Sequence, residues 1–517
     1  MAKRFELNLL ILFIILGLVL RLIFLKDGAI TFGFDQARDA YTAQAIANGD
    51  LKILGPSAST PGLYHGVLYF YLITPSYWLG GGNPVVTNTW LSIINILTII
   101  PIFWLGRLLF SSNVGLLAAF LFAISFDAVQ YANWMSNPAL AVLTGALFYL
   151  GLAIIVFSKA WIVGTVLTAI GLGLSIQFEV FLAYLIFPLL ISLWVFKVRI
   201  KSNQILLFGL IFSIIISSMI VSYIKFGPTF LLGFANLYSA GGDPFGNWRE
   251  FFPTLGLYLN RFTEYFYRGL LPFNVVVAGV IWILIVGLAI KSVIKHEKFN
   301  KKILFILILI FSHGVLIPFG GESTPFINAG LQASILILVS FFIVSHFSKH
   351  KILMSFLTLL IIFSSIYAIF KYNPQGQTVF AIQRGLTLHN ELAAIDYSYQ
   401  AANKERFSIN TITSPFWINT VWAYLYNWYG FKRYGYLPSF HGRDQTGYLG
   451  QLPQVTNQDK VYLLIIEPLD GIPQQFTEGT LGYENSFSKI VEERKFGGIV
   501  VQKRILIKPF DQISFIK

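Results

Sequence analysis

Two aspartates and an arginine near the start of the chain are spaced so that they can act together. Asp35, Arg38 and Asp39 lie at positions i, i+3 and i+4 of the segment 32–41, so a helix there places all three on one face. Asp35 can accept the proton of a hydroxyl group, and Arg38 can hold an anion or orient the carboxylate. The alternative is structural, with Asp35 as the N-cap of a helix whose charged face is solvated.

Polar residues in two later loops are further candidates for binding a ligand. Tyr64 and His65 stand in a tyrosine-rich segment, where His65 can bind phosphate, sugar or a metal ion, or be a structural histidine at a membrane interface. Trp134 and Asn137 lie in the amide-rich turn 127–138, which can hydrogen-bond a polar ligand while the indole stacks on a sugar ring. The alternative for this turn is a capped hairpin with an interfacial tryptophan.

Charged residues farther along the chain can meet an anionic substrate. Arg261 and Arg268 share one helical face, with Glu264 beside them. Two guanidinium groups at a membrane surface suit a lipid phosphate, because guanidinium pairs bidentately with phosphate oxygens; the alternative is that both extend to lipid headgroups. Glu179 and Glu322 are isolated carboxylates at the ends of apolar runs, and such groups are candidates for function. A divalent metal ion would need two or three carboxylates to converge.

Several classes of protein are excluded by what the sequence lacks. It has no cysteine, which excludes disulfides, thiol catalysis and cysteine-ligated zinc. It contains no Walker loop, no dinucleotide-binding fingerprint in its required context, and no metalloprotease or serine-hydrolase motif. The net charge of +13 comes from basic residues concentrated in short loops, where membrane topology and anionic lipid explain them, so we expect no nucleic-acid partner.

The composition is that of a polytopic membrane protein. Of the 517 residues, 56% are hydrophobic and only 12% are charged, which excludes an ordinary soluble globular protein. We expect about eleven membrane-spanning helices, because that many apolar runs approach the roughly 20 residues that cross a hydrocarbon core. The runs lie near residues 7–25, 86–108, 114–130, 138–157, 160–177, 180–196, 205–224, 272–293, 303–319, 327–346 and 351–370.

The distribution of charge predicts the orientation of this bundle. With the N-terminus in the cytoplasm, lysine and arginine fill the cytoplasmic loops, as the positive-inside rule requires. Ten of the twelve acidic residues before residue 372 then fall on the outer side or at the outer ends of helices. We therefore expect a multi-pass plasma-membrane protein whose polar chemistry and C-terminal segment are extracytoplasmic.

The expected architecture has two parts. Residues 1–371 form an all-α membrane module with large outer loops at 26–85 and 225–271, and the first of these loops contains an amphipathic helix from Asp35 to Asn48. Residues 372–517 are less hydrophobic and form a soluble α/β or α+β domain on the outer face.

Within this C-terminal domain we predict strands at 461–466 and 498–507 and a helix at 387–400. The segment 424–436, rich in tyrosine and tryptophan, can contact sugar by stacking or form the core of the domain.

The order of these features resembles that of a known family. A first span, a long outer loop opening with Asp35, an arginine three residues later and the return segment Pro61-Gly-Leu-Tyr64 are similar to polytopic glycosyltransferases of the GT-C fold. These are the enzymes of glycosyltransferase family 39, grouped with protein O-mannosyltransferases and aminoarabinose lipid A transferases. The resemblance implies that Asp35 is the catalytic base and that the donor is a polyprenyl-phosphate sugar. Gln36 stands where the family commonly has glutamate, so a second carboxylate would have to come from Asp39.

The sequence thus predicts a membrane glycosyltransferase that moves a sugar from a polyprenyl-phosphate donor to a hydroxyl on a lipid, glycan or protein acceptor. One base opposite one departing phosphate predicts an inverting single displacement. Arginines or a divalent metal ion would stabilise the phosphate. The alternatives are a transporter or lipid-linked glycan flippase, which usually shows repeated halves and broken helices at the midplane, and a non-catalytic binding subunit of the same fold.

Overall fold

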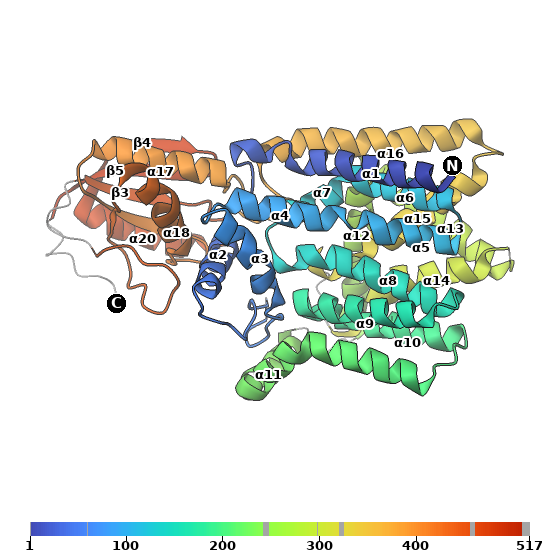
Figure 1. The fold of residues 1–517 in the computed structure, drawn as a ribbon. Helices are drawn as coiled ribbons and strands as arrows, with labels where there is room; N and C mark the ends of the chain where they lie inside the picture. Colours follow the sequence, from blue (N-terminus) through green and yellow to red (C-terminus); the bar gives the residue numbers. More distant parts are fainter. Residues whose placement is uncertain are drawn as a thin grey trace.

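The computed structural model of the chain describes residues 2–58, 60–240, 248–296, 298–319, 325–454 and 461–508. Its larger part is a bundle of apolar helices, and its smaller part is a C-terminal domain built on one sheet (Figure 1). The bundle helices are α1 (Ala2–Leu22), α4 (Pro84–Ile96), α5 (Ile99–Leu109), α6 (Ser112–Ile124), α7 (Phe126–Ala132), α8 (Ala141–Phe157), α9 (Trp161–Phe178), α10 (Ile186–Val195), α11 (Ser202–Ala240), α12 (Trp248–Leu270), α13 (Val275–Ile294), α14 (Asn300–Phe311), α15 (Leu331–His346) and α16 (Lys351–Tyr372).

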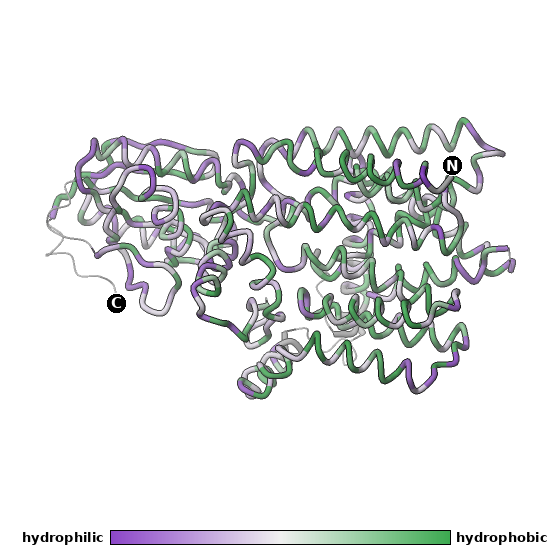
Figure 2. The backbone as a smooth tube through the Cα atoms, in the orientation of Figure 1, coloured by the Kyte–Doolittle hydropathy of each residue, from purple (hydrophilic) through white to green (hydrophobic). Residues whose placement is uncertain are grey.

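The bundle is that of an integral membrane protein. Hydrophobic residues fill its helices, whereas hydrophilic ones gather in the C-terminal domain and in the loops at the opposite end (Figure 2). By length and composition, seven helices of the described residues can cross a membrane, or up to eight if the bent pair α6 and α7 is one span. A polytopic all-α membrane bundle with a C-terminal α/β domain is therefore confirmed.

The number of full-length spans is lower than the eleven expected, because some apolar runs form short or broken helices. Ser125 leaves the helical conformation between α6 and α7 and accepts a hydrogen bond from Ala128 N–H, so the two helices meet at 58°. Val180–Val195 and Leu331–His346 are apolar helical segments shorter than a span. Hydropathy alone does not distinguish a spanning helix from such a segment.

Two further helices occupy the loop after α1. The predicted amphipathic helix is α2 (Phe34–Ala47), and the chain turns away from it at Gly49, whose φ of +92° favours glycine. The aromatic helix α3 (Leu68–Leu79) follows and packs against α2. These two helices lie between the bundle and the C-terminal domain (Figure 1).

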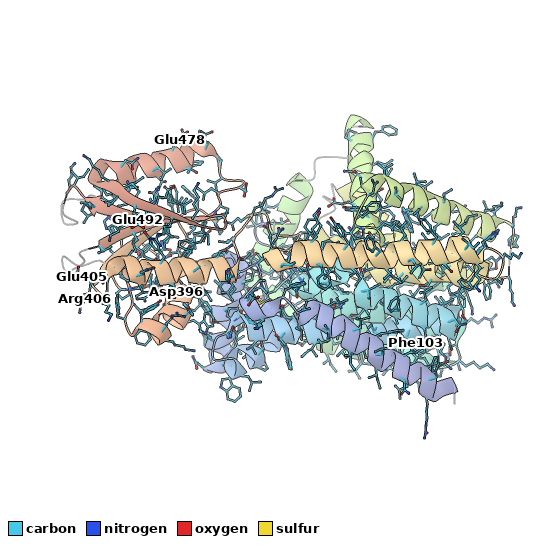
Figure 3. The ribbon with its side chains drawn as sticks, turned by 90° about the horizontal axis from the view of Figure 1, so that it is seen from above. Phe103, Asp396, Glu405, Arg406, Glu478 and Glu492 are labelled. Carbon is cyan, nitrogen blue, oxygen red and sulfur yellow. The ribbon has the colours of Figure 1, made fainter. Side chains whose placement is uncertain are left out.

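The C-terminal domain contains a mixed five-stranded sheet in the order β2-β1-β3-β5-β4. The strand β1 pairs in parallel with β2 and β3, and β5 pairs antiparallel with β3 and β4. Helices α17 and α20 lie on opposite sides of the sheet, as their labelled residues Asp396 and Glu478 show (Figure 3). Both predicted strands and the predicted helix are confirmed. The elements are α17 (Leu388–Ala402), β1 (Phe407–Ile412), α18 (Thr420–Leu425), α19 (Phe431–Tyr434), β2 (Ser439–Phe440), β3 (Val461–Ile466), α20 (Gln474–Phe487), β4 (Ser488–Phe496) and β5 (Ile499–Leu506).

The C-terminal domain is docked directly on α2. Tyr424 of α18 is buried there, and its hydroxyl donates a hydrogen bond to the Gly82 carbonyl over 2.6 Å. Its ring meets Tyr41 of α2 edge-on, with the centroids 5.1 Å apart. Tyr426 is also buried, so these two aromatic residues of the segment 424–436 belong to the core and the interface. These contacts fix α2 from the side of the C-terminal domain.

An arginine fixes the first helix from the membrane side. Arg21 is fully buried, and its guanidinium donates to Asn95 Oδ1 on α4 over 3.0 Å and to the Ala123 carbonyl on α6 over 3.0 Å. A buried guanidinium is tolerated only where acceptors surround it. Arg21 therefore ties α1 to two neighbouring helices just before the loop that carries α2.

We expect Arg21→Leu to destabilise the bundle. The change leaves Asn95 and a backbone carbonyl without their donor, at a cost on the order of 2–5 kcal/mol. Thermal unfolding in detergent should show a melting temperature several degrees lower. The control is Arg107→Leu, which removes a partly exposed ion pair to Glu6 worth about 0–1 kcal/mol. Equal melting temperatures for both variants would contradict the anchoring role of Arg21.

Candidate functional site

The start of α2 is organised by Gln36 and not by Asp35. Gly33 is the N-cap residue, and its N–H donates to the Gln36 side-chain oxygen over 2.9 Å. The Gln36 amide donates in turn to the Met135 carbonyl over 2.9 Å, which ties α2 to the turn after α7. The alternative that Asp35 is the N-cap is therefore wrong. Asp35 lies in the first turn, where the helix dipole stabilises an ionised carboxylate.

Arg38 joins the two aspartates, as a helical face predicts. Its Nη1 lies 2.8 Å from Asp35 Oδ1, and its Nη2 lies 2.8 Å from Asp39 Oδ1. The two carboxylates differ in their surroundings, because the Asp35 side chain is 61% exposed and that of Asp39 is 3% exposed. One carboxylate of the group can thus reach a substrate, while the other holds the arginine.

The buried carboxyl has a perturbed proton affinity. Burial raises the pKa of Asp39 to about 6, and the negative charge of Asp35 acts in the same direction. Arg38 and a hydrogen bond from the Tyr69 hydroxyl oppose this rise. Tyr69 comes from α3, so the packing of α3 on α2 completes the environment of Asp39.

His65 and Glu179 form a second polar pair close to this group. His65 Nδ1 accepts a hydrogen bond from the Val180 N–H over 3.2 Å and lies 3.6 Å from Glu179 Oε1. Burial lowers the pKa of His65 to about 3, and the positive charge of Arg38 adds to this effect. His65 is therefore neutral at pH 7 and carries its proton on Nε2. Tyr64 is half-buried beside Phe230, with the ring centroids 6.0 Å apart.

The turn 127–138 supports the site through its amides. Asn137 is buried and donates to the Phe178 carbonyl, next to Glu179 in the chain. Trp134 is only 8% exposed and packs on Phe326 and Phe380, with centroid distances of 4.9 and 4.5 Å. Its indole belongs to an aromatic cluster in this structure and does not present a stacking face to solvent.

A second charged group lies across Tyr131. Arg268 Nε is 3.4 Å from Asp127 Oδ1, and its Nη1 is 2.9 Å from Glu264 Oε1. Tyr131 lies within electrostatic range of Arg268 in this group and of Glu179 in the pair with His65. The structure thus links Arg268, from a distant part of the chain, to the His65–Glu179 pair through Tyr131.

Two site residues predicted from the sequence stay untested, and two features of the site were not predicted. Arg261 lies within α12, but its side chain, like the whole of Glu322, is outside the described residues. The pairing of Asp127 and the role of Tyr69 were missed. An aspartate within an apolar run was a signal for the first, since such a group requires a partner; nothing in the sequence singled out Tyr69 among the many tyrosines.

Within the described ranges, no three histidine or acidic side chains group as metal ligands do.

The fold connects this site to a class of proteins. No protein-family model matches the sequence, and no curated protein matches it either. ArnT from Cupriavidus metallidurans, in a crystal structure bound to undecaprenyl phosphate, superposes with a TM-score of 0.55 at 12% identity over 95% of this chain and 97% of that chain. Its apo structure gives a TM-score of 0.52 over the same shares. The chain therefore has the GT-C fold that its sequence resembles.

The Asp39 carboxyl should make unfolding depend on pH. Its pKa of about 6 in the folded state exceeds the ordinary value of 3.8, so between these pH values the folded protein holds the Asp39 proton more tightly than the unfolded protein does. The free energy of unfolding therefore falls as the pH rises from 3.8 to about 6. Asp39→Asn removes this group, so the melting temperature of the variant relative to the wild type should rise from about pH 4 to pH 6 and stay level above about pH 7. A difference that is the same across this window in detergent would show that Asp39 titrates normally.

Proposed function

We propose that the chain is a membrane glycosyltransferase that moves a hexosyl or pentosyl unit from a polyprenyl-phosphate carrier to a hydroxyl group of an acceptor. The observation that carries this proposal is the exposed Asp35 carboxylate held by Arg38 at the start of α2, between the bundle and the C-terminal domain. The GT-C fold and the undecaprenyl phosphate bound to ArnT support a lipid-phosphate donor.

Asp35 acts as the general base in this proposal. Its Oδ1 accepts the bond from Arg38, so Oδ2 takes the proton of the acceptor hydroxyl. The hydroxyl oxygen forms a bond to the anomeric carbon while the bond from that carbon to the phosphate oxygen breaks. The phosphate departs with the electron pair, and attack from the opposite face inverts the anomeric configuration. No covalent intermediate with the protein is formed.

The departing phosphate needs positive charge more than it needs an acid. Arg38 is the cation nearest to the base, and we assign it the dual role of orienting Asp35 and facing the phosphate. Arg268 supplies a second cation beyond Tyr131. On the side of Glu179, His65 Nε2 and Asn137 add hydrogen-bonding capacity. The proposal also includes contacts of Arg261 and Glu322 with the substrate. It further includes a divalent metal ion that would stabilise the phosphate.

The two parts of the chain have separate tasks in this proposal. Residues 1–371 form the catalytic membrane module, and residues 372–517 cover it from the extracytoplasmic side. The acceptor, on a lipid, a glycan or a protein, approaches from that side of the plasma membrane. The positive-inside pattern of the loops supports this orientation.

The rival proposals are less well supported. A transporter or flippase usually places broken helices and its charged groups near the membrane midplane, whereas Asp35 and Arg38 lie on a helix outside the spans. A non-catalytic subunit of the same fold would not need an exposed carboxylate held at a fixed position. Gln36 has a structural task in capping α2, so the lack of a glutamate there does not favour an inactive protein.

Asp35→Asn should abolish sugar transfer while leaving the fold and donor binding intact. Losing a general base lowers turnover by roughly 10²–10⁴-fold. We would measure release of radiolabelled sugar from a panel of polyprenyl-phosphate donors by the purified protein in detergent. The matched control is Asp50→Asn, an exposed acid just beyond the same helix, which should keep full activity. Full activity in Asp35→Asn would overturn the assignment of the base, and no turnover with any donor would favour the transport or binding proposals.

Arg38→Lys tests whether sugar transfer requires the two separate nitrogens with which the guanidinium holds Asp35 and Asp39. Lysine keeps the charge but cannot hold two carboxylates with separate nitrogens, so we expect kcat to fall roughly 10–100-fold. The assay is repeated with a chelator and with added Mg²⁺ or Mn²⁺. Recovery of the variant by metal would show that a metal ion shares the phosphate with Arg38. An unchanged kcat without metal would remove Arg38 from the mechanism.

A further inference from the structure

The C-terminal domain contains a cavity that the proposed reaction does not use. It has a volume of about 240 Å³ and lies between α20 and the strands β1 and β2. This is below the roughly 300–1,000 Å³ of pockets for drug-sized ligands, so its occupant is a small unit.

Aromatic rings form much of the cavity wall. Trp417 lies in the loop after β1, and Phe476 and Tyr483 project from α20. The Trp417 indole N–H donates to Thr480 Oγ1 over 3.3 Å, which fixes the ring against α20. The Arg443 guanidinium lies 3.3 Å from the centroid of the same ring. The wall is therefore both apolar and held in place.

Polar groups line the inner part of the same cavity. Glu484 is fully buried, and its carboxylate accepts hydrogen bonds from Asn410 Nδ2 over 2.7 Å and from the Tyr462 hydroxyl over 2.6 Å. Each of its oxygens receives one of these bonds and has a second lone pair. Glu484 can thus accept further hydrogen bonds from a ligand, while Arg443 at the same cavity can donate them.

The loop that carries the indole is conformationally strained. Trp417 has a φ of +66°, in the left-handed region that a bulky side chain rarely adopts. Such strain persists where the surroundings over-determine it. Here the Glu467 carboxylate accepts the Ser414 N–H over 3.0 Å and the Gln445 side chain donates to the Trp417 carbonyl over 3.1 Å.

We propose that this cavity is a saccharide-binding site, which takes one sugar ring against the aromatic wall of Trp417, Phe476 and Tyr483 with its hydroxyl groups on Glu484 and Arg443. A sugar ring has an apolar C–H face and a polar edge, and this cavity offers aromatic walls together with acceptors and donors. A purely apolar occupant, such as a peptide side chain, would leave the donors of Arg443 and the second lone pairs of the Glu484 oxygens without ligand partners.

The position of the cavity connects it to the candidate active site. His441 and Arg443 line the cavity at the start of a loop that reaches α2 at Gly450. Gly450 packs so closely on the Tyr41 ring that a Cβ atom there would clash with the Tyr41 hydroxyl group. The site therefore suits a sugar unit of the acceptor, and this assignment alone rests on the proposed function. Binding of the sugar does not rest on it.

Direct binding by the full-length protein in detergent tests the proposal. The probes are free mono- and disaccharides with neutral, N-acetylated, amino and acidic rings, followed by ligand-observed saturation-transfer NMR. We expect at least one sugar to bind the wild type and Asp35→Asn equally. Its Kd should rise at least tenfold in Trp417→Ala and in the isosteric Glu484→Gln.

Tyr448→Ala is the matched control, because Tyr448 is an exposed aromatic residue of the same loop that does not line the cavity. It should bind as the wild type does, and melting temperatures identify any variant that fails to fold. The proposal is overturned if no sugar binds, if binding survives Glu484→Gln, or if an apolar peptide binds in place of sugars. Sugar binding without any transferase activity would support this site and reject the proposed function.

Discussion

The contact on which the site depends is the bridge of Arg38 between Asp35 and Asp39. Two carboxylates one helical turn apart repel each other, and one of them is buried. A single guanidinium with separate nitrogens for each carboxylate removes this conflict and orients the exposed one. The surrounding structure maintains this bridge: Tyr69 from α3 bonds Asp39, and Gln36 fixes the start of the helix on the turn after α7.

The position of α2 is set from two sides. Arg21 ties the end of α1 to α4 and α6 within the bundle. Tyr424 of the C-terminal domain packs on α2 from the other side and bonds the Gly82 carbonyl. A helix in a loop has few intrinsic reasons to stay in one place, so these contacts convert it into a rigid support. The C-terminal domain thus helps to hold α2 in place, even though none of its residues belongs to the Asp35 group.

Buried polar groups recur wherever the structure departs from a simple bundle. The glutamate after α9 pairs with His65, and the aspartate at the start of α7 pairs with Arg268. Each departure also coincides with a short or broken helix, because a polar group near the membrane needs partners from several segments.

The sequence by itself determined the membrane class, a helix at 35–48, two of the five strands of the C-terminal domain and the spacing of Asp35, Arg38 and Asp39. These features depend on local periodicity, hydropathy and helical geometry, which neighbouring residues specify. Only the tertiary structure decided that Asp39 is buried and Asp35 exposed, that Gln36 caps the helix, and that Arg268 pairs with Asp127. The same holds for the cavity around Trp417 and Glu484. Burial and pairing join residues that are tens to hundreds of positions apart, and no local pattern encodes which of them meet.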